Sequence, residues 1–229
     1  MSTKCKKSLI SGPVTLFAVI ISIIFSIFSI FSICSSPAIS QVAMAPDFQA
    51  VDLDGKNVSL SGYRGEAVLL HITNIENPLC RECENALDAQ TNQLSQLAEM
   101  DPGVNIITLN VRKNSYSLDG RELAEGWWNA NITGPWIEDF DPYPLTGKYI
   151  DYSTLEGGFA NPTLILIDKE GNVAGLYHVY QLGKGEIDGI QSAESLKSDL
   201  ERIEAGEASG FEGIASRQGI NYLGMFALG

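Results

Sequence analysis

The residues best suited to chemistry in this 229-residue chain are Cys80 and Cys83, which two other residues separate. On the first turn of a helix, this spacing brings two Cα atoms to about 5–6 Å, the distance that a disulfide requires. The free N–H groups at a helix start lower a thiol pKa from its usual ~8.5, so a cysteine there reacts at neutral pH. We therefore predict a reversible dithiol–disulfide pair in which Cys80 attacks and Cys83 resolves the mixed disulfide.

The charges beside the pair bear on the direction of electron transfer. Arg81 would stabilise a thiolate, whereas Glu76, Glu82 and Glu84 oppose it. If the acids prevail, the pKa of Cys80 falls less and the pair tends to donate electrons. We therefore predict a reductant.

Few other metal ligands accompany the pair. The remaining cysteines lie before residue 35, and the chain has two histidines, His71 and His178. A disulfide scaffold or a zinc site would need more cysteines or histidines. We therefore expect an exchangeable disulfide, with no metal and no cofactor. His71 falls within the apolar run that precedes the pair, where it either assists proton transfer to Cys83 or is an ordinary hydrogen-bonded strand residue.

Apolar runs and helical spacing give the elements that position the pair. A buried strand precedes it, and a helix, a second strand and a second helix follow: residues 67–72, 84–100, 104–111 and 119–130. Asp101-Pro102-Gly103 ends the first helix. A hairpin of strands 163–168 and 173–180 comes later, before a last helix that Ser192 caps and Gly206 stops.

Two further stretches complete the domain. Strand candidates at residues 48–53 and 57–60, joined by Asp54-Gly55, predict an opening hairpin. Residues 131–153 are rich in Pro, Gly and aromatic side chains, so we expect an irregular insertion or a cap over the site.

The N-terminal region predicts a membrane segment. Residues 9–34 are almost wholly apolar and follow Lys4, Lys6 and Lys7, which favours a single anchor with the rest of the chain outside the cytoplasm. A cleaved signal near Ala38-Ile39-Ser40 is the alternative. We thus expect a tip and anchor at 1–44, one domain at 45–206, and an apolar, glycine-rich tail at 207–229 that resembles the start of a truncated membrane segment.

The charge of the chain narrows the choice of partners. It carries 28 acidic and 15 basic residues, a net charge of −13. This balance argues against nucleic acid or anionic headgroups as ligands.

These motifs together resemble the thioredoxin superfamily. From about residue 45 to 205 the chain is similar to the membrane-anchored TlpA/ResA-type thiol-disulfide oxidoreductases that serve cytochrome c maturation. The matching motifs are Ala45-Pro46-Asp47-Phe48, the pair Cys80 and Cys83, Pro162-Thr163, and the turn from Leu166 to Gly171. Two departures are Leu79, where the family usually has Trp, and a longer loop at 73–78.

The resemblance implies an α/β thioredoxin fold with an N-terminal β-hairpin extension, preceded by one transmembrane helix. It also implies that Pro162 is cis and lies against the disulfide, with the backbone of Asn161 available to a bound peptide. Protein disulfides, apocytochrome c among them, would be the substrates, and a CcdA/DsbD-type membrane protein would be the electron donor.

Other interpretations stay open. A thioredoxin-fold copper metallochaperone would use Cys80, Cys83 and a distant histidine, for which His178 is the downstream candidate. A non-catalytic thioredoxin-like binding module would keep the pair as a structural disulfide. A peroxidase needs a lone reactive cysteine, which the paired motif does not suggest.

Overall fold

The computed structural model describes residues 43–76, 79–113, 119–128, 130–156 and 158–207. The predicted membrane segment at residues 9–34 and the tail from residue 208 onward lie outside this part of the chain. No helix within the described ranges has the length and apolar composition needed to cross a bilayer.

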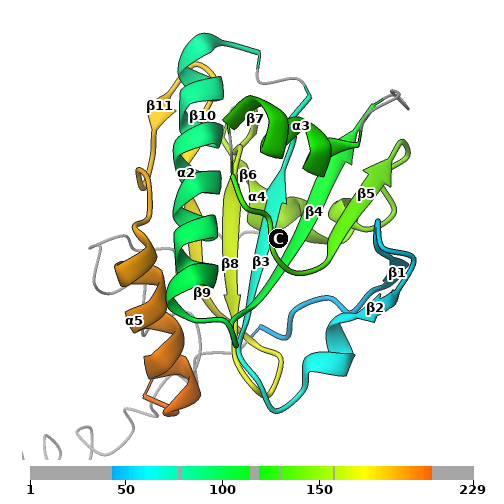
Figure 1. Ribbon diagram of the computed structural model, residues 1–229, viewed down its shortest axis with the longest axis vertical. Helices are drawn as coiled ribbons and strands as arrows, with labels where there is room; N and C mark the ends of the chain where they lie inside the picture. The colour runs from blue at the N-terminus through cyan, green and yellow to red at the C-terminus, as the bar shows by residue number, and fades with distance from the viewer. Residues whose placement is uncertain (1–42, 77–78, 114–118, 129, 157, 208–229) are drawn as a thin grey trace, which may run out of the picture. The chain divides into compact units, whose positions relative to one another are not determined.

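A five-stranded sheet forms the centre of the domain, in the order β5-β4-β3-β8-β9 (Figure 1). Its strands are β3 (Val68–Thr73), β4 (Asn105–Arg112), β5 (Trp136–Phe140), β8 (Thr163–Ile167) and β9 (Val173–His178). Strands β3, β4 and β5 run parallel to one another, and β8 runs antiparallel to both of its neighbours, β3 and β9. All residues of β3 are buried, which explains why its sequence is a nearly continuous apolar run.

Helices and short strands cover both faces of this sheet. On one face, α2 (Arg81–Met100) and α5 (Ala193–Glu204) share an apolar core with β3 and β8. Figure 1 shows α3 (Gly120–Trp128) in front of the sheet beside α2, and α4 (Ile150–Ser153) behind it. The other face packs against β1 (Gln49–Val51), β2 (Asn57–Ser59) and the 3₁₀ helices η1 (Leu60–Tyr63) and η2 (Thr146–Tyr149).

Three antiparallel pairs lie outside the main sheet: β1 with β2, β6 (Thr154–Leu155) with β7 (Gly158–Phe159), and β10 (Tyr180–Gln181) with β11 (Gly185–Glu186). Parallel strands joined through α2, followed by the β8–β9 hairpin and α5, give a thioredoxin-like α/β fold.

The predicted caps of the last helix are confirmed. The Ser192 side chain accepts a hydrogen bond from the Ser195 N–H at 3.2 Å. Gly206 follows the helix with a φ of 73°, a left-handed conformation that glycine adopts without steric cost.

The expectation that residues 131–153 are irregular is wrong, because they contain strand β5 and two short helical turns. Adjacent acids, Glu138 and Asp139, hid this strand, since such residues are rare in strands. Both carboxylates have partners: Asp139 accepts a 2.7 Å bond from the Thr146 N–H, and Glu138 lies 3.1 Å from Arg112. The segment therefore completes an edge of the sheet.

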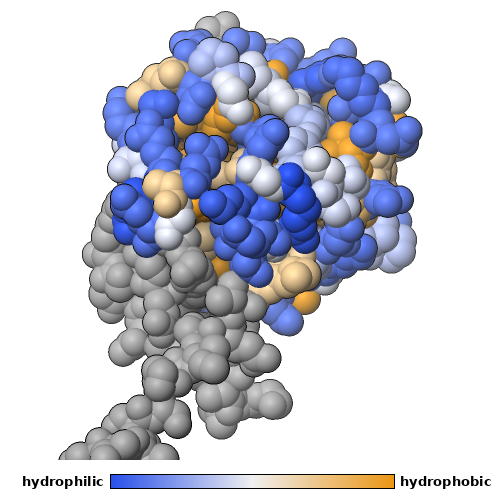
Figure 2. Space-filling view, turned by 90° about the horizontal axis from the view of Figure 1, so that it is seen from below, coloured by the Kyte–Doolittle hydropathy of each residue, from blue (hydrophilic) through white to orange (hydrophobic). Residues whose placement is uncertain are grey.

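Figure 2 views the molecule from the end opposite to the start of α2. Hydrophilic residues cover most of the visible described surface there, and hydrophobic ones are scattered among them.

Candidate active site

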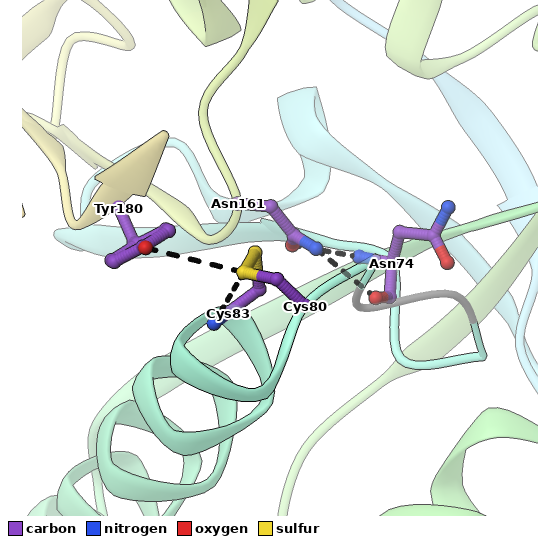
Figure 3. The surroundings of a disulfide bond; sticks show 5 residues. All are labelled: Asn74, Cys80, Cys83, Asn161 and Tyr180. Atoms are coloured by element: carbon purple, nitrogen blue, oxygen red, sulfur yellow. Dashed lines mark hydrogen bonds between the residues drawn. A yellow bond between two sulfur atoms is a disulfide. The ribbon is translucent and has the colours of Figure 1, made fainter. Parts of the chain in front are cut away.

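Cys80 and Cys83 form a disulfide at the N-terminus of α2 (Figure 3). Their Cα atoms lie 5.0 Å apart, within the range that a disulfide allows. Cys80 is the N-cap residue and is partly exposed, whereas Cys83, inside the first turn, is 4% exposed. An external thiol therefore reaches the sulfur of Cys80 more readily than that of Cys83.

Two hydrogen-bond donors face the Cys80 sulfur. The Cys83 backbone N–H donates to it at 3.0 Å, because the N-cap position leaves this N–H without a partner in the helix. The Tyr180 hydroxyl lies 3.9 Å from the same sulfur, and it is the donor because a disulfide sulfur carries no hydrogen (Figure 3). Both contacts would stabilise negative charge on the sulfur.

Asn161 joins the cis-proline turn to the end of β3. The Asn161–Pro162 peptide is cis, the isomer that the resemblance implies. The Asn161 side chain accepts the Asn74 N–H at 3.0 Å and donates to the Asn74 carbonyl at 3.1 Å (Figure 3). Its own backbone N–H donates to the Tyr180 carbonyl at 2.8 Å. A peptide could pair with that N–H only by displacing the Tyr180 carbonyl, and the pairing of a bound peptide with the Asn161 backbone stays a prediction.

A buried ion cluster holds the loop between β3 and the disulfide. Arg112, at the end of β4, forms a salt bridge with Glu76 of this loop and a second, at 3.1 Å, with Glu138 of β5. All three side chains are less than 8% exposed. Beside them, the Asn110 side chain accepts the Ile75 N–H at 3.1 Å. The loop is therefore anchored to the sheet by side chains of β4.

Glu138 is the acid with most contacts in this cluster. Burial raises the pKa of Glu138, whereas the Gly120 N–H, the Trp136 indole and the Arg112 charge act in the opposite direction. Gly120 lies so close to Asn110 that a Cβ at this position would overlap the Asn110 amide nitrogen. The start of α3 therefore depends on a glycine at this position.

The ion cluster changes the predicted electrostatics of the dithiol. Glu76 was expected to oppose a Cys80 thiolate, but it is neutralised by Arg112. Arg81, Glu82 and Glu84 are exposed on the first turn of α2. Solvent and salt screen such exposed charges, so their effect on Cys80 is reduced.

Leu79 precedes the disulfide in an uncommon conformation. Its φ is 65°, in the left-handed region that residues other than glycine seldom occupy, and its side chain is 65% exposed. The residue that replaces the family's tryptophan therefore presents an apolar side chain to solvent next to Cys80.

His71 lies on β3 but beside the middle of α2. Its Nδ1 atom is 3.3 Å from the Thr108 hydroxyl, and the ring borders a cavity of about 10 Å³ together with Thr91 and Ser95. Thr91 follows Cys83 by two helical turns, about 12 Å along the axis. Proton transfer from His71 to Cys83 would thus need an intermediate group, and this role stays a prediction.

The burial of His71 predicts a pH dependence of stability. Burial lowers the pKa of His71 to about 3, whereas an unfolded chain has a histidine pKa of about 6.5. As the pH falls below about 6.5, the unfolded chain takes up a proton that the folded chain excludes, so the free energy of unfolding decreases. Between pH 7 and pH 5, we expect this protein to lose about 2 kcal/mol more than a His71→Gln variant in urea unfolding. Parallel pH profiles for the two proteins would contradict this assignment.

His178, the last residue of β9, has two polar partners outside that strand. Its Nε2–H donates to the Tyr152 carbonyl at 2.7 Å, and Nδ1 lies 3.9 Å from a carboxylate oxygen of Asp188. Burial lowers the pKa of His178, which the Tyr152 carbonyl and the Asp188 charge partly offset. Copper binding at His178 would have to compete with these contacts. Within the described ranges, no three His, Cys, Asp or Glu residues gather as metal ligands.

Several residues of the site were not found from the sequence. These are Tyr180 and Asn74 next to the disulfide, and Asn110, Arg112 and Glu138 beneath its loop. One signal was present, since Asn110 and Arg112 are polar residues within a strand that is otherwise largely apolar. Buried polar groups need partners, so they mark a place where another segment must contact the strand.

The fold and the site together define a class. A disulfide at the start of α2, linked through Tyr180 to a cis-proline turn just before β8, is the arrangement of a thioredoxin-fold thiol-disulfide oxidoreductase. Within that class, the chain belongs to the AhpC/TSA family, whose sequence model matches residues 42–183.

The chain is also similar to individual proteins. The chain is 29% identical over 166 residues to the thiol-disulfide oxidoreductase ResA of Geobacillus thermodenitrificans, covering 72% of this chain and 79% of the relative. It is 25% identical over 173 residues to ResA of Bacillus subtilis, covering 76% and 81%. A crystal structure of a thioredoxin family thiol:disulfide interchange protein from Chlorobium tepidum aligns with a TM-score of 0.49 at 20% identity, covering 73% of this chain and 99% of that one.

Proposed function

We propose that this protein reduces disulfide bonds of other proteins through Cys80 and Cys83. The observation that carries the proposal is the asymmetry of the pair at the start of α2, where Cys80 is partly exposed and Cys83 is buried. Such an asymmetry lets a substrate disulfide reach one sulfur and keeps the other for the second step.

The reaction has two exchange steps. The Cys80 thiolate attacks one sulfur of the substrate disulfide, forming a mixed disulfide and releasing the other substrate sulfur as a thiolate that takes a proton. The Cys83 thiolate then attacks the Cys80 sulfur, closing the Cys80–Cys83 disulfide and releasing the second substrate thiol. Two electrons and two protons thereby pass from the enzyme to the substrate, and an external dithiol must reduce the enzyme again.

The acidic surroundings support reduction over oxidation. Glu82 and Glu84 lie on the first turn of α2, where their negative charge opposes a Cys80 thiolate and therefore disfavours the reduced form of the pair, by an amount that their exposure limits. A pair with a less stabilised thiolate is a better electron donor. Arg81 is the one basic residue of this turn.

The direction can be tested by equilibrium with glutathione. We expect a standard potential below about −180 mV, together with reduction of insulin disulfides by the reduced protein. A potential near −120 mV, the strongly oxidising end of the range, or no reduction of insulin would contradict the proposal.

We also propose that the enzyme is tethered to the cell membrane by residues 9–34, with the domain from residue 45 to 206 outside the cytoplasm. The apolar run and the three lysines before it support this placement. The full chain should float with membranes, whereas a chain that starts at Ala45 should not. Recovery in the soluble fraction of a chain shortened near Ala38-Ile39-Ser40 would exclude the anchor and indicate a cleaved signal.

The proposed partners follow from the resemblance to the TlpA/ResA-type oxidoreductases. Proteins with exposed disulfides are the proposed substrates, apocytochrome c among them, and a CcdA/DsbD-type membrane protein is the proposed electron donor. Asn161 and Pro162 would line the place where the substrate lies, since Tyr180, whose carbonyl accepts the Asn161 N–H, also contacts the Cys80 sulfur. Trapping a mixed disulfide on a Cys83→Ser variant and identifying the bound protein would decide which substrate is used.

A further inference from the structure

Tyr180 contacts the sulfur that the proposed reaction uses. Its hydroxyl is 3.9 Å from the Cys80 sulfur, and the residue lies 100 positions further along the chain. Figure 3 shows the Tyr180 ring approaching the disulfide from the side opposite to Asn74. The Cys83 N–H reaches the same sulfur from within α2. Cys80 therefore faces one donor from its own helix and one from β10.

The position of Tyr180 is fixed by its backbone and by its neighbour. The Tyr180 carbonyl accepts the Asn161 N–H at 2.8 Å. The next residue, Gln181, forms a β-bridge with Ala160, and its buried side chain donates to the Gly158 carbonyl at 2.9 Å. The hydroxyl is thus held against the sulfur by a strand that is tied to the cis-proline turn.

The charged groups near this contact are exposed. On α2 they are Arg81, Glu82 and Glu84, and on the β10–β11 hairpin they are Lys184 and Glu186, the cross-strand partner of Tyr180. Solvent screens these charges, whereas a hydroxyl in direct contact with the sulfur is little screened. Hydrogen bonds to an ionised acceptor are also stronger than those between neutral groups. The hydroxyl should therefore affect a Cys80 thiolate more than any one of these charges.

We propose that the Tyr180 hydroxyl donates a hydrogen bond to the Cys80 thiolate of the reduced enzyme and thereby activates Cys80 as the attacking sulfur. The proposal rests on the function proposed above. The hydroxyl keeps its own proton throughout. When the thiolate attacks a substrate disulfide, the new S–S bond forms at Cys80, the substrate S–S bond breaks, and the departing substrate thiolate takes a proton from solvent.

The test is the pH dependence of Cys80 alkylation in the reduced full-length protein. Iodoacetamide reacts with the thiolate, and mass spectrometry of the peptide that carries Cys80 separates its rate from those of the other cysteines. In Tyr180→Phe we expect the midpoint of the rate profile to move up by about half to one pH unit, so that alkylation below the midpoint slows about three- to tenfold. Tyr180 is partly exposed and loses only its hydroxyl, so the melting temperature should change little.

Tyr63→Phe is the matched control, because Tyr63 packs against the opposite face of the sheet. It should leave the Cys80 profile unchanged. An unchanged midpoint in Tyr180→Phe would overturn the role of Tyr180, and an equal shift in Tyr63→Phe would show that the effect is indirect, which also overturns it. Alkylation needs no protein substrate, so it tests the hydrogen bond separately from the reductase activity. If the midpoint shifts in Tyr180→Phe but the protein does not reduce insulin, the proposed function is rejected and the hydrogen bond is retained.

Discussion

Replacing Cys80 by serine is expected to abolish the reduction of insulin disulfides, by a factor on the order of 10³ or more, because the reaction then has no attacking sulfur. The Cys83→Ser variant should behave differently. Its Cys80 still attacks, but no second thiol can release the substrate, so a mixed disulfide accumulates. Turnover of insulin measures the first effect, and non-reducing electrophoresis with mass spectrometry of the Cys80 peptide measures the second.

A third variant provides the control for these two. Cys34→Ser also removes a thiol, but from the segment before the domain, and it should reduce insulin at the rate of the unmodified chain. Turnover that survives in Cys80→Ser would contradict the assignment of Cys80 as the attacking residue. Trapping in Cys80→Ser instead of Cys83→Ser would reverse the two roles.

Replacing Arg112 by methionine is expected to lower the free energy of unfolding by about 3–5 kcal/mol, because it leaves two buried carboxylates without their cation. Glu76 and Glu138 both contact Arg112, and each is less than 8% exposed. The loss is measured by chemical denaturation at pH 7. The loop that leads to Cys80 should also become more susceptible to proteolysis, because its salt bridge to β4 is gone.

A more exposed arginine gives the matched comparison. Arg121 lies 3.0 Å from Asp54, and the two side chains are 24% and 44% exposed, so Arg121→Met should cost about 0–1 kcal/mol. Adding Glu76→Gln and Glu138→Gln to Arg112→Met should recover part of the loss, since no buried charge then remains unpaired. Equal costs for Arg112→Met and Arg121→Met would show that the buried cluster contributes no more than a surface ion pair.

Local sequence patterns were sufficient to predict most of the strands and helices of the domain. The apolar run before the cysteines became β3, and the spacing of Leu87, Leu94 and Leu97 became the buried face of α2. The two strands after Pro162 pair antiparallel, as the turn between them predicts. Such signals can be read from the sequence because side-chain periodicity reports which face of an element is buried.

Strand β5 shows where local patterns were insufficient. Trp136 and Ile137 favour a strand, but Glu138 and Asp139 do not, unless partners for both acids are known. Those partners are Arg112 and Thr146, and neither is adjacent in sequence. The strand is stabilised by contacts that form only when β4 and the following turn are in place.

By itself, the sequence determined the chemistry of the pair. Two thiols three positions apart at a helix start can form one exchangeable disulfide whatever surrounds them, because that geometry is local to one helical turn. The groups that surround the sulfur come from distant parts of the chain and are brought together by folding. Tyr180 reaches Cys80 across 100 positions, Asn161 holds Asn74 across 87, and Arg112 removes the expected influence of Glu76. These contacts depend on how β10, β8 and β4 are ordered in space, which no short stretch of the chain specifies.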